Sequence, residues 1–183
     1  MIPSDVFRDQ QTLVGEQVRL EPLGPAVLDD YLAALDDPEL ARLTGSHGTH
    51  DQEQVVRWLT TRRDHHDRAD WAAIRIADGA FLGEAVINDL DVDNESANYR
   101  ILLAGTHRDQ GYGTEITRLV VDHAFAVGLH RLSLGVFAFN PRAQRVYEKC
   151  GFVLEGRRRD ALRWDGEWHD ELVMAVLSTD PRG

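Results

Sequence analysis

The stretch "RDQGYG" at residues 108–113 places two glycines, one residue apart, between a strand-like and a helix-like segment. It follows the apolar, strand-like "YRILLAG" (99–105) and precedes "TEITRLVVDHAFAVG" (114–128), in which apolar residues repeat at helical spacing. Glycine lets a backbone adopt positive φ and approach a ligand closely. The free N–H groups at a helix start attract anions. The stretch therefore predicts a strand-to-helix turn that can cradle a phosphate group, with Arg108 as an added cation.

Three other kinds of turn could also contain such a glycine pair. An ordinary turn that merely needs glycine fits the stretch about equally well. A Rossmann loop would place a third glycine where Ile116 stands, and an acidic residue about 20 positions further on, where the sequence reads "RLSLG". A P-loop would need Gly-Lys-Ser/Thr, which is absent from this stretch. If a pyrophosphate binds here, neither common fingerprint describes its site.

The second informative stretch is "NPRAQRVYEKCGF" (140–152), which has the signals of a short helix. Asn140 suits the N-cap, Pro141 the first helical position and Gly151 the stop. Tyr147 follows Asn140 by two turns and shares its face, about 10 Å further along the helix. An amide and a phenol on one face at this separation suit a long, thin ligand arm.

The order of expected elements predicts a mixed α/β fold with one mixed, mostly antiparallel sheet and helices packed on its faces. The three-strand run in its middle indicates a meander rather than a doubly wound parallel sheet. We expect residues 1–13 to be a loose arm, 14–178 one domain and 179–183 a tail. Strands are expected at 16–23, 71–78, 81–90, 97–105, 131–137, near 152–160 and at 167–177, and helices at 25–35, 37–43, 51–66, 114–127 and 141–149.

Composition narrows the class of protein. The chain has 183 residues, 43% of them hydrophobic and 28% charged, as in a globular domain. Its net charge of −11 argues against a nucleic-acid partner. The charge is compatible with a cationic partner, and equally with an acidic surface that only keeps the protein in solution. One cysteine allows no disulfide within the chain. We see neither the pattern of a signal peptide nor an apolar run of the ~20 residues that span a bilayer, so we expect a cytoplasmic protein without a membrane partner.

The two motifs together resemble a known family. Arg-x-x-Gly-x-Gly at a strand-to-helix junction, followed by Asn-x-x-Ala-x-x-x-Tyr-Glu-Lys-x-Gly-Phe, looks like the GNAT superfamily of acetyl-CoA-dependent N-acetyltransferases. The likeness covers about residues 13–177. The ending, 155–177, is similar to RimJ/RimL-type protein N-terminal acetyltransferases and to bacterial spermidine acetyltransferases. The resemblance implies a GNAT fold with a central splay beside "LSLGV" (132–136), acetyl-CoA as co-substrate and no metal. A homodimer is left open.

The resemblance also implies roles for individual residues. Asn140 would hydrogen-bond the pantetheine arm, and Tyr147 would protonate the departing CoA thiolate. Ala143 departs from the serine that many RimL-like members carry. The pyrophosphate would bind main-chain amides of the loop, and the pantetheine arm and acetyl carbonyl would lie at the strand end. The implied loop residues are Arg108, Gln110, Gly111, Tyr112, Gly113 and Thr114, and the implied strand residues are Leu102, Leu103 and Ala104.

The general base and the acceptor are left open by the sequence. Glu84 is our best single candidate for the base, with Asn88 on the same strand face, Asp89, the 165–170 loop and a water relay as alternatives. A lysine-like amine, with a pKa of ~10.4, needs a base more than an α-amine with a pKa of ~7.7–8 does. The acceptor is a protein N-terminus, a polyamine or another small amine. A non-catalytic acyl-CoA-binding module is the competing function.

Overall fold

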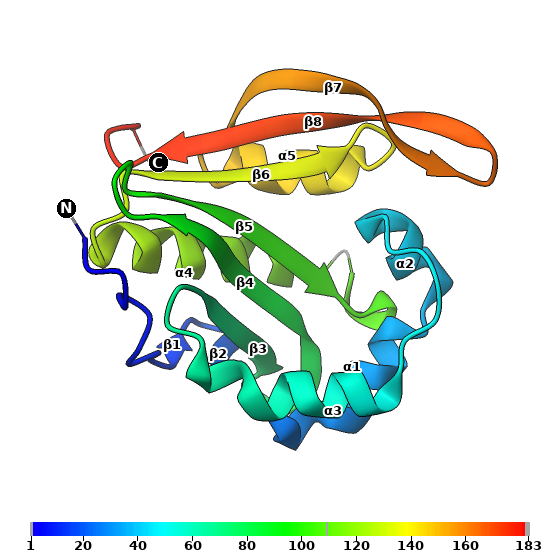
Figure 1. Cartoon of the computed structure of the whole chain (residues 1–183), viewed down its shortest axis with the longest axis horizontal. Helices are drawn as coiled ribbons and strands as arrows, with labels where there is room; N and C mark the ends of the chain where they lie inside the picture. Colours follow the sequence, from blue (N-terminus) through cyan, green and yellow to red (C-terminus); the bar gives the residue numbers. More distant parts are fainter. Residues whose placement is uncertain (1, 109, 182–183) are drawn as a thin grey trace.

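The strands form one sheet whose order follows the chain except at its last edge. The computed structural model describes residues 2–108 and 110–181, and within them eight strands lie in the order β1-β2-β3-β4-β5-β6-β8-β7 (Figure 1). Within the described residues, the only parallel pair is β5 with β6, and all other neighbouring strands are antiparallel. The predicted mixed, mostly antiparallel sheet is therefore confirmed. The strands are β1 Leu13–Val14, β2 Val18–Pro22, β3 Ala69–Arg75, β4 Phe81–Asp91, β5 Ser96–Leu103, β6 Arg131–Phe137, β7 Val153–Trp164 and β8 Glu167–Leu177.

The helices follow the sequence expectations closely. Strand β6 and helix α5 have the predicted bounds. Helix α5 begins after Asn140 because the Asn140 side chain accepts the capping hydrogen bond from the Ala143 N–H at 3.1 Å, as its N-cap position predicts. The expected helix at 51–66 is shorter, since it ends at Thr61 and passes into a 3-10 turn. The helices are α1 Leu28–Leu35, α2 Pro38–Thr44, α3 Gln52–Thr61, α4 Tyr112–Ala126 and α5 Pro141–Lys149, with 3-10 turns at Pro25–Val27, Arg62–Asp64 and Gly105–His107.

Residues 2–11 pack against the rest of the described structure, whereas the sequence predicted a loose arm over 1–13. Ile2 and Phe7 are buried in the main core. The Gln10 side chain donates a hydrogen bond to the Asp70 carbonyl oxygen, and the Gln11 carbonyl oxygen accepts one from the Trp71 indole. Phe7 lies near the ring of His123 on α4, and Ile2 lies against Gly128 just after that helix, with exposed fractions of 3% and 7%. These two apolar side chains hold the segment in place, and the polar residues between them gave no sign of it.

Strands β5 and β6 pair briefly and then separate. Among the described residues their register covers 96–98 against 131–133, yet β5 continues to Leu103 and β6 to Phe137. Figure 1 shows the two strands close together near the chain termini and spreading apart toward α2. A parallel pair that stops early leaves main-chain groups of both strands facing a gap. The splay that the family resemblance implied is present.

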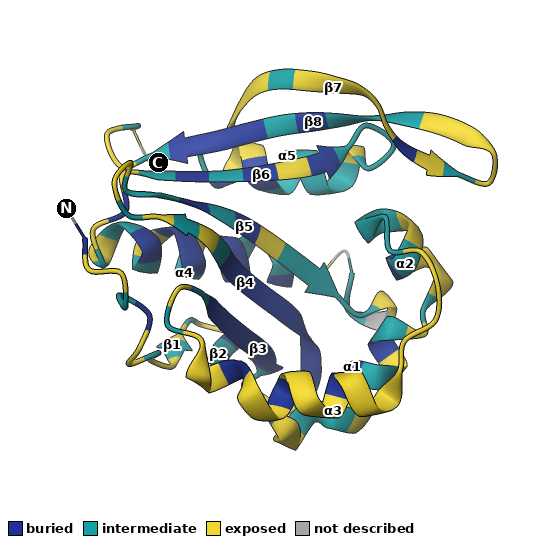
Figure 2. Ribbon diagram, viewed as in Figure 1, coloured by how far each residue is buried: buried dark blue, intermediate teal, exposed yellow. Residues whose placement is uncertain are grey.

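The two faces of the sheet carry separate cores, because successive side chains of a strand point to opposite faces. On the face that α4 and α5 cover, Tyr99 packs with Ile116 and Tyr147. On the face that α1, α2 and α3 cover, Tyr31 packs with Leu59. We call these the α4–α5 face and the α1–α3 face. Figure 2 shows β3 and β4 buried between them, whereas most of the β7 edge is exposed.

No described helix is long and apolar enough to cross a bilayer.

Gly83 allows the tight pairing of β4 with β5 beside the gap. Its φ is +152°, and a Cβ there would stand 1.9 Å from the Leu102 carbonyl oxygen. A side chain would therefore strain the backbone and push the two strands apart at the end of β5.

We predict that Gly83→Ala lowers the free energy of unfolding by about 2–5 kcal/mol, since it adds both backbone strain and overpacking. Urea denaturation measures the change. Gly156→Ala is the matched control, because a Cβ at Gly156 meets nothing within 4 Å. Equal stability of the two variants would contradict this role of Gly83.

Candidate active site

The main cleft of the described structure opens at the gap between β5 and β6. Its volume is about 680 Å³, and residues of both sheet halves and of helices α1–α5 line it. Most of the predicted site residues line this cleft, although they come from segments far apart in the chain. The predicted residues on its lining are Glu84, Leu102, Leu103, Arg108, Gly111, Gly113, Thr114, Asn140 and Tyr147.

The start of α4 faces this cleft. Gly111 is the N-cap residue, in the left-handed conformation with φ +88°, and no described side chain caps the helix. A Cβ at Gly111 would meet no described atom within 4 Å, so the space in front of the helix start is open. The first N–H groups of a helix have no partner inside it and carry partial positive charge. This geometry can hold an anion.

Three predicted residues lie outside the cleft lining. The Tyr112 side chain is buried in the core, where its hydroxyl interacts with Arg75. Gln110 is exposed on the loop. The Ala104 N–H donates to the Leu82 carbonyl oxygen at 2.9 Å and is therefore taken up by β4. For Gln110 and Tyr112 only main-chain roles toward a ligand remain as predictions.

The β5 backbone presents alternate residues to the gap. In an antiparallel pair, residues whose N–H and C=O point to the partner alternate with residues whose groups point away. Ala104 is bonded to β4, so the main-chain groups of Leu103 and Ile101 point toward the gap. The Leu103 carbonyl oxygen confirms this direction, since it accepts a hydrogen bond from Arg108 Nε at 3.3 Å.

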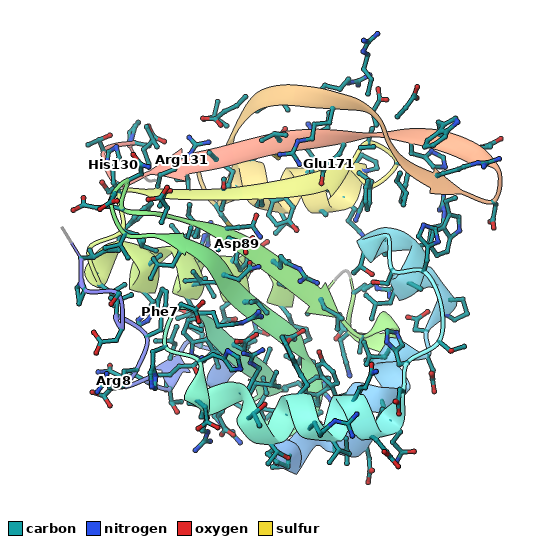
Figure 3. The ribbon with its side chains drawn as sticks, in the orientation of Figure 1. Phe7, Arg8, Asp89, His130, Arg131 and Glu171 are labelled. Atoms are coloured by element: carbon teal, nitrogen blue, oxygen red, sulfur yellow. The ribbon has the colours of Figure 1, made fainter. Side chains whose placement is uncertain are left out.

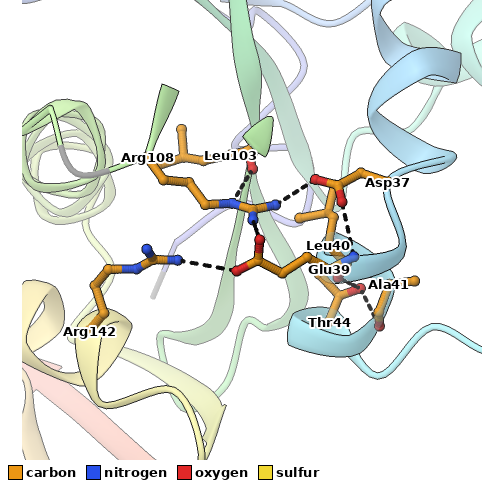
Figure 4. A network of polar contacts seen from close by, with 8 residues as sticks. All are labelled: Asp37, Glu39, Leu40, Ala41, Thr44, Leu103, Arg108 and Arg142. Carbon is orange, nitrogen blue, oxygen red and sulfur yellow. Dashed lines mark hydrogen bonds and ion pairs between the residues drawn. The ribbon is translucent and has the colours of Figure 1, made fainter. Parts of the chain in front are cut away.

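Arg108 is engaged differently from the expectation that it adds a free cation to the phosphate cradle. Its guanidinium pairs with Asp37 Oδ2 at 2.8 Å and with Glu39 Oε2 at 2.7 Å, and its side chain is 9% exposed (Figure 4). Asp37 is also the N-cap of α2. Arg142 of α5 reaches Glu39 at 3.9 Å. The arginine therefore ties the end of β5 to α2, and two carboxylates already balance its charge.

Helix α5 places Asn140 and Tyr147 along the cleft. The side-chain oxygen of Asn140 accepts the hydrogen bond that caps the helix, so its amide N–H₂ is the group that can bind a ligand. Tyr147 lies edge-on to Tyr99, with ring centroids 6.4 Å apart. Burial raises the pKa of Tyr147 well above its ordinary value of 10. The phenol is therefore protonated at neutral pH, which is the form that a general acid must have.

Glu84 lies in the cleft on the α1–α3 face, opposite Leu102 on β5. Its carboxylate accepts a hydrogen bond from the Tyr31 hydroxyl at 3.1 Å. Burial raises the pKa of Glu84 to about 7, with a further rise from the nearby charge of Asp70 and an opposing effect of Arg100. A carboxylate with this pKa can accept a proton near neutral pH.

The alternatives to Glu84 lie elsewhere. Asn88 accepts a hydrogen bond from the Asn98 side chain, and neither Asp89 nor the described loop 165–170 lines the cleft. Sequence reasoning missed Tyr31, Trp58 and Glu171, which do line it. The sequence around Tyr31 indicated only the apolar face of a helix. The sequence around Glu171 indicated only a strand, which does not show that the side chain lines the cleft.

Neither the cysteine nor a metal site adds to the chemistry of the described cleft. Cys150 is buried, its thiol lies 3.6 Å from the Thr114 carbonyl oxygen, and burial raises its pKa to about 11. A buried thiol with a raised pKa is a poor nucleophile, so Cys150 serves as a packing residue of the core. Among the described residues, no group of three His, Cys, Asp or Glu side chains is arranged to hold a metal ion.

Comparison with known proteins identifies relatives of this chain. A model of the acetyltransferase (GNAT) domain matches residues 17–153. The probable N-acetyltransferase YjcK of Bacillus subtilis is 44% identical over 75 residues, which are 40% of this chain and 41% of that protein. The chain thus matches less than half the length of this relative. The putative ribosomal N-acetyltransferase YdaF of Bacillus subtilis is 28% identical over 182 residues, covering 99% of this chain and 90% of that protein.

Spermidine N(1)-acetyltransferase of Vibrio cholerae is 28% identical over 116 residues, covering 62% of this chain and 67% of that protein. A crystal structure of spermidine N-acetyltransferase from Vibrio cholerae, in complex with CoA and spermine, matches with a TM-score of 0.82 at 20% identity. The match covers 91% of this chain and 98% of that one. At this identity it shows that the fold is shared.

The raised pKa of Glu84 predicts a pH-dependent stability. A folded-state pKa of about 7, against the ordinary 4.5, means that the folded protein holds this proton more tightly than the unfolded chain does. Stability from Glu84 is therefore present below its unfolded pKa and is lost as the pH rises toward 7. Glu84→Gln mimics the protonated form and does not titrate. Its free energy of unfolding, relative to that of the wild type, should therefore rise by about 3 kcal/mol from pH 4 to pH 8.

Urea denaturation of both proteins across this pH range measures the difference, in which the remaining titratable groups cancel. Parallel stability curves would mean that Glu84 titrates at an ordinary pKa.

Proposed function

The chain belongs to the GNAT family of acetyltransferases, and on this premise we propose that it transfers an acetyl group from acetyl-CoA to a primary amine by direct attack in a ternary complex. The observation that carries the proposal is the cleft at the strand gap, which Glu84 enters from one face of the sheet and Tyr147 from the other. A competing function, an acyl-CoA-binding module without turnover, does not need a base and an acid at one gap.

The proposed path of acetyl-CoA follows the cleft. The pyrophosphate binds main-chain N–H groups at the start of α4, in front of Gly111. The pantetheine arm runs along α5, where Asn140 offers its amide N–H₂. The thioester then enters the gap, and the gap-facing N–H of Leu103 polarises its carbonyl oxygen. Arg108 contributes by fixing the end of β5 to α2, because its guanidinium is already paired there.

The proposed chemistry uses the two faces of the sheet for two proton transfers. The neutral amine attacks the thioester carbon from the α1–α3 face, forming the C–N bond, and the carboxylate of Glu84 accepts the proton that the amine loses. The C–S bond breaks, and the Tyr147 hydroxyl protonates the departing CoA thiolate on the α4–α5 face. The products are an N-acetyl amine and CoA, with solvent returning Glu84 and Tyr147 to their starting protonation states.

The proposed acceptor is a small cationic amine of the polyamine kind. The net charge of −11 and the carboxylates in the cleft favour a cationic substrate, and a spermidine acetyltransferase is among the relatives. A protein N-terminal amine is the second candidate, because the relative that aligns over 99% of the chain is a putative ribosomal N-acetyltransferase. The same relative supports a place in the RimJ/RimL-like branch, and we propose a cytoplasmic enzyme.

The cofactor site predicts a selective loss of ligand response. Acetyl-CoA at 100 times its Kd should stabilise the wild type by roughly 2.7 kcal/mol, seen as a higher Tm. Gly111→Val should abolish this shift, because a side chain in the left-handed conformation distorts the helix start and fills the space in front of it. Thermal unfolding with and without acetyl-CoA measures the effect.

Gly166→Val is the matched control, since Gly166 has a similar φ of +87° and open space around it but lies in the β7–β8 turn. It should keep the full ligand shift. If folded Gly111→Val shows the same rise in Tm with acetyl-CoA as the wild type, the pyrophosphate does not bind at this site.

Tyr147→Phe should lower kcat by about 10²–10⁴, the usual loss for a general acid, with little change in acetyl-CoA affinity. The ring and its packing remain, and only the proton donor is removed. Release of free CoA thiol measures turnover, and Tyr112→Phe is the control, because its hydroxyl lies outside the cleft. If kcat of Tyr147→Phe stays within about threefold of wild type while chemistry limits the rate, water or another residue protonates the thiolate.

A further inference from the structure

We propose that Glu171 selects the acceptor: its carboxylate binds a second cationic nitrogen of the amine substrate, so that the preferred acceptors are linear diamines and polyamines rather than monoamines. This inference rests on the proposed function and names the substrate class of the same site. It assigns a specificity role to a residue that no sequence motif marked.

Glu171 lies at the margin of the gap, on the β6 side. It stands on β8 opposite Phe137 of β6, and it lines the cleft. Figure 3 shows it beside β6, away from the exposed end of the β7–β8 hairpin. Leu134 and Val136 of β6 belong to the core on the α4–α5 face. Gly135, Phe137 and Glu171 therefore face the α1–α3 side, where Glu84 also lies.

Gly135 makes room for this carboxylate. A Cβ at Gly135 would stand 2.1 Å from Glu171 Oε1 and 2.7 Å from its carboxyl carbon. The carboxylate thus rests on the bare backbone of β6, at a position beyond the part of β6 that pairs with β5. Glu84 and Glu171 then flank the gap from opposite sides, on the face from which the amine attacks.

The cations around the gap decide where a second ammonium group can bind. Arg100 of β5 lines the cleft and acts on Glu84, whose pKa it lowers against the larger effects of burial and Asp70. The β5 side thus repels an additional positive charge. On the β6 side, Arg158 Nη1 holds Glu171 Oε2 at 2.9 Å, but the Arg158 side chain is 68% exposed, against 21% for Glu171.

An exposed ion pair of this kind holds its carboxylate weakly. A carboxylate has about four lone-pair sites, so Glu171 can accept hydrogen bonds from Arg158 and from a substrate ammonium together. A diamine whose first nitrogen reacts at the gap would place its second nitrogen against Glu171. A monoamine leaves this contact unused, and the carboxylate then favours one class of acceptor over the other.

The experiment compares kcat/KM for pairs of acceptors that share a carbon chain and differ by one ammonium group, such as putrescine and n-butylamine, over several chain lengths. The wild type should prefer diamines. Glu171→Gln should lower the ratio of diamine to monoamine kcat/KM by about tenfold, which corresponds to about 1.4 kcal/mol. The loss should appear mainly in KM for the diamine, because the contact is not made to the reacting atoms.

Two further variants separate this role from a change in overall charge or in folding. Glu167→Gln removes the same charge from an exposed position of β8 outside the cleft, and it should keep the wild-type ratio. Gly135→Ala keeps the charge but displaces the Glu171 carboxylate, and it should lower the ratio as Glu171→Gln does. Circular dichroism checks that each variant is folded.

An unchanged ratio in folded Glu171→Gln, or an equal loss in Glu167→Gln, would overturn the inference while amine acetylation stands. A wild type that acetylates monoamines and diamines equally would overturn it as well. If the wild type releases no CoA thiol with any amine, the proposed function itself fails, and the inference fails with it.

Discussion

The early end of pairing between β5 and β6 is the constraint on which the site depends. These strands are hydrogen-bonded over 96–98 and 131–133, and their divergence leaves main-chain groups of Leu103 without a strand partner on the gap side. The Leu103 carbonyl oxygen accepts a hydrogen bond from Arg108, and a ligand that enters the gap can supply a partner for the Leu103 N–H. The gap also opens to both faces of the sheet, so side chains of the α4–α5 face and of the α1–α3 face can reach one ligand.

The rest of the architecture keeps this gap open and defined. Gly83 lets β4 follow β5 closely on one side, while Arg108 fixes the end of β5 to the two carboxylates of α2. At the other end of α2, Gly45 lies against Phe137 of β6, where a Cβ would stand 2.9 Å from the ring. Helix α2 therefore contacts both diverging strands and spans the opening between them.

Local sequence signals predicted the elements well, and non-local contacts were what they missed. Asn140, Pro141 and Gly151 set the bounds of α5 through capping and turn chemistry, which neighbouring residues decide. The pairing of Arg108 with Asp37 and Glu39 joins segments about 70 positions apart, so no local pattern could reveal it. The same holds for Glu171, because its place over Gly135 depends on the register of β6 with β8.

Amide hydrogen exchange on β5, followed by NMR with and without saturating acetyl-CoA, shows whether the thioester binds between the diverging strands. Leu103 and Ile101 direct their N–H groups into the gap, whereas Leu102 belongs to the alternate set that faces β4. We expect acetyl-CoA to slow exchange at Leu103 and Ile101 and to leave Leu102, already bonded in the sheet, nearly unchanged. Saturating acetyl-CoA that protects neither gap-facing amide would contradict the claim that the thioester binds between the diverging strands.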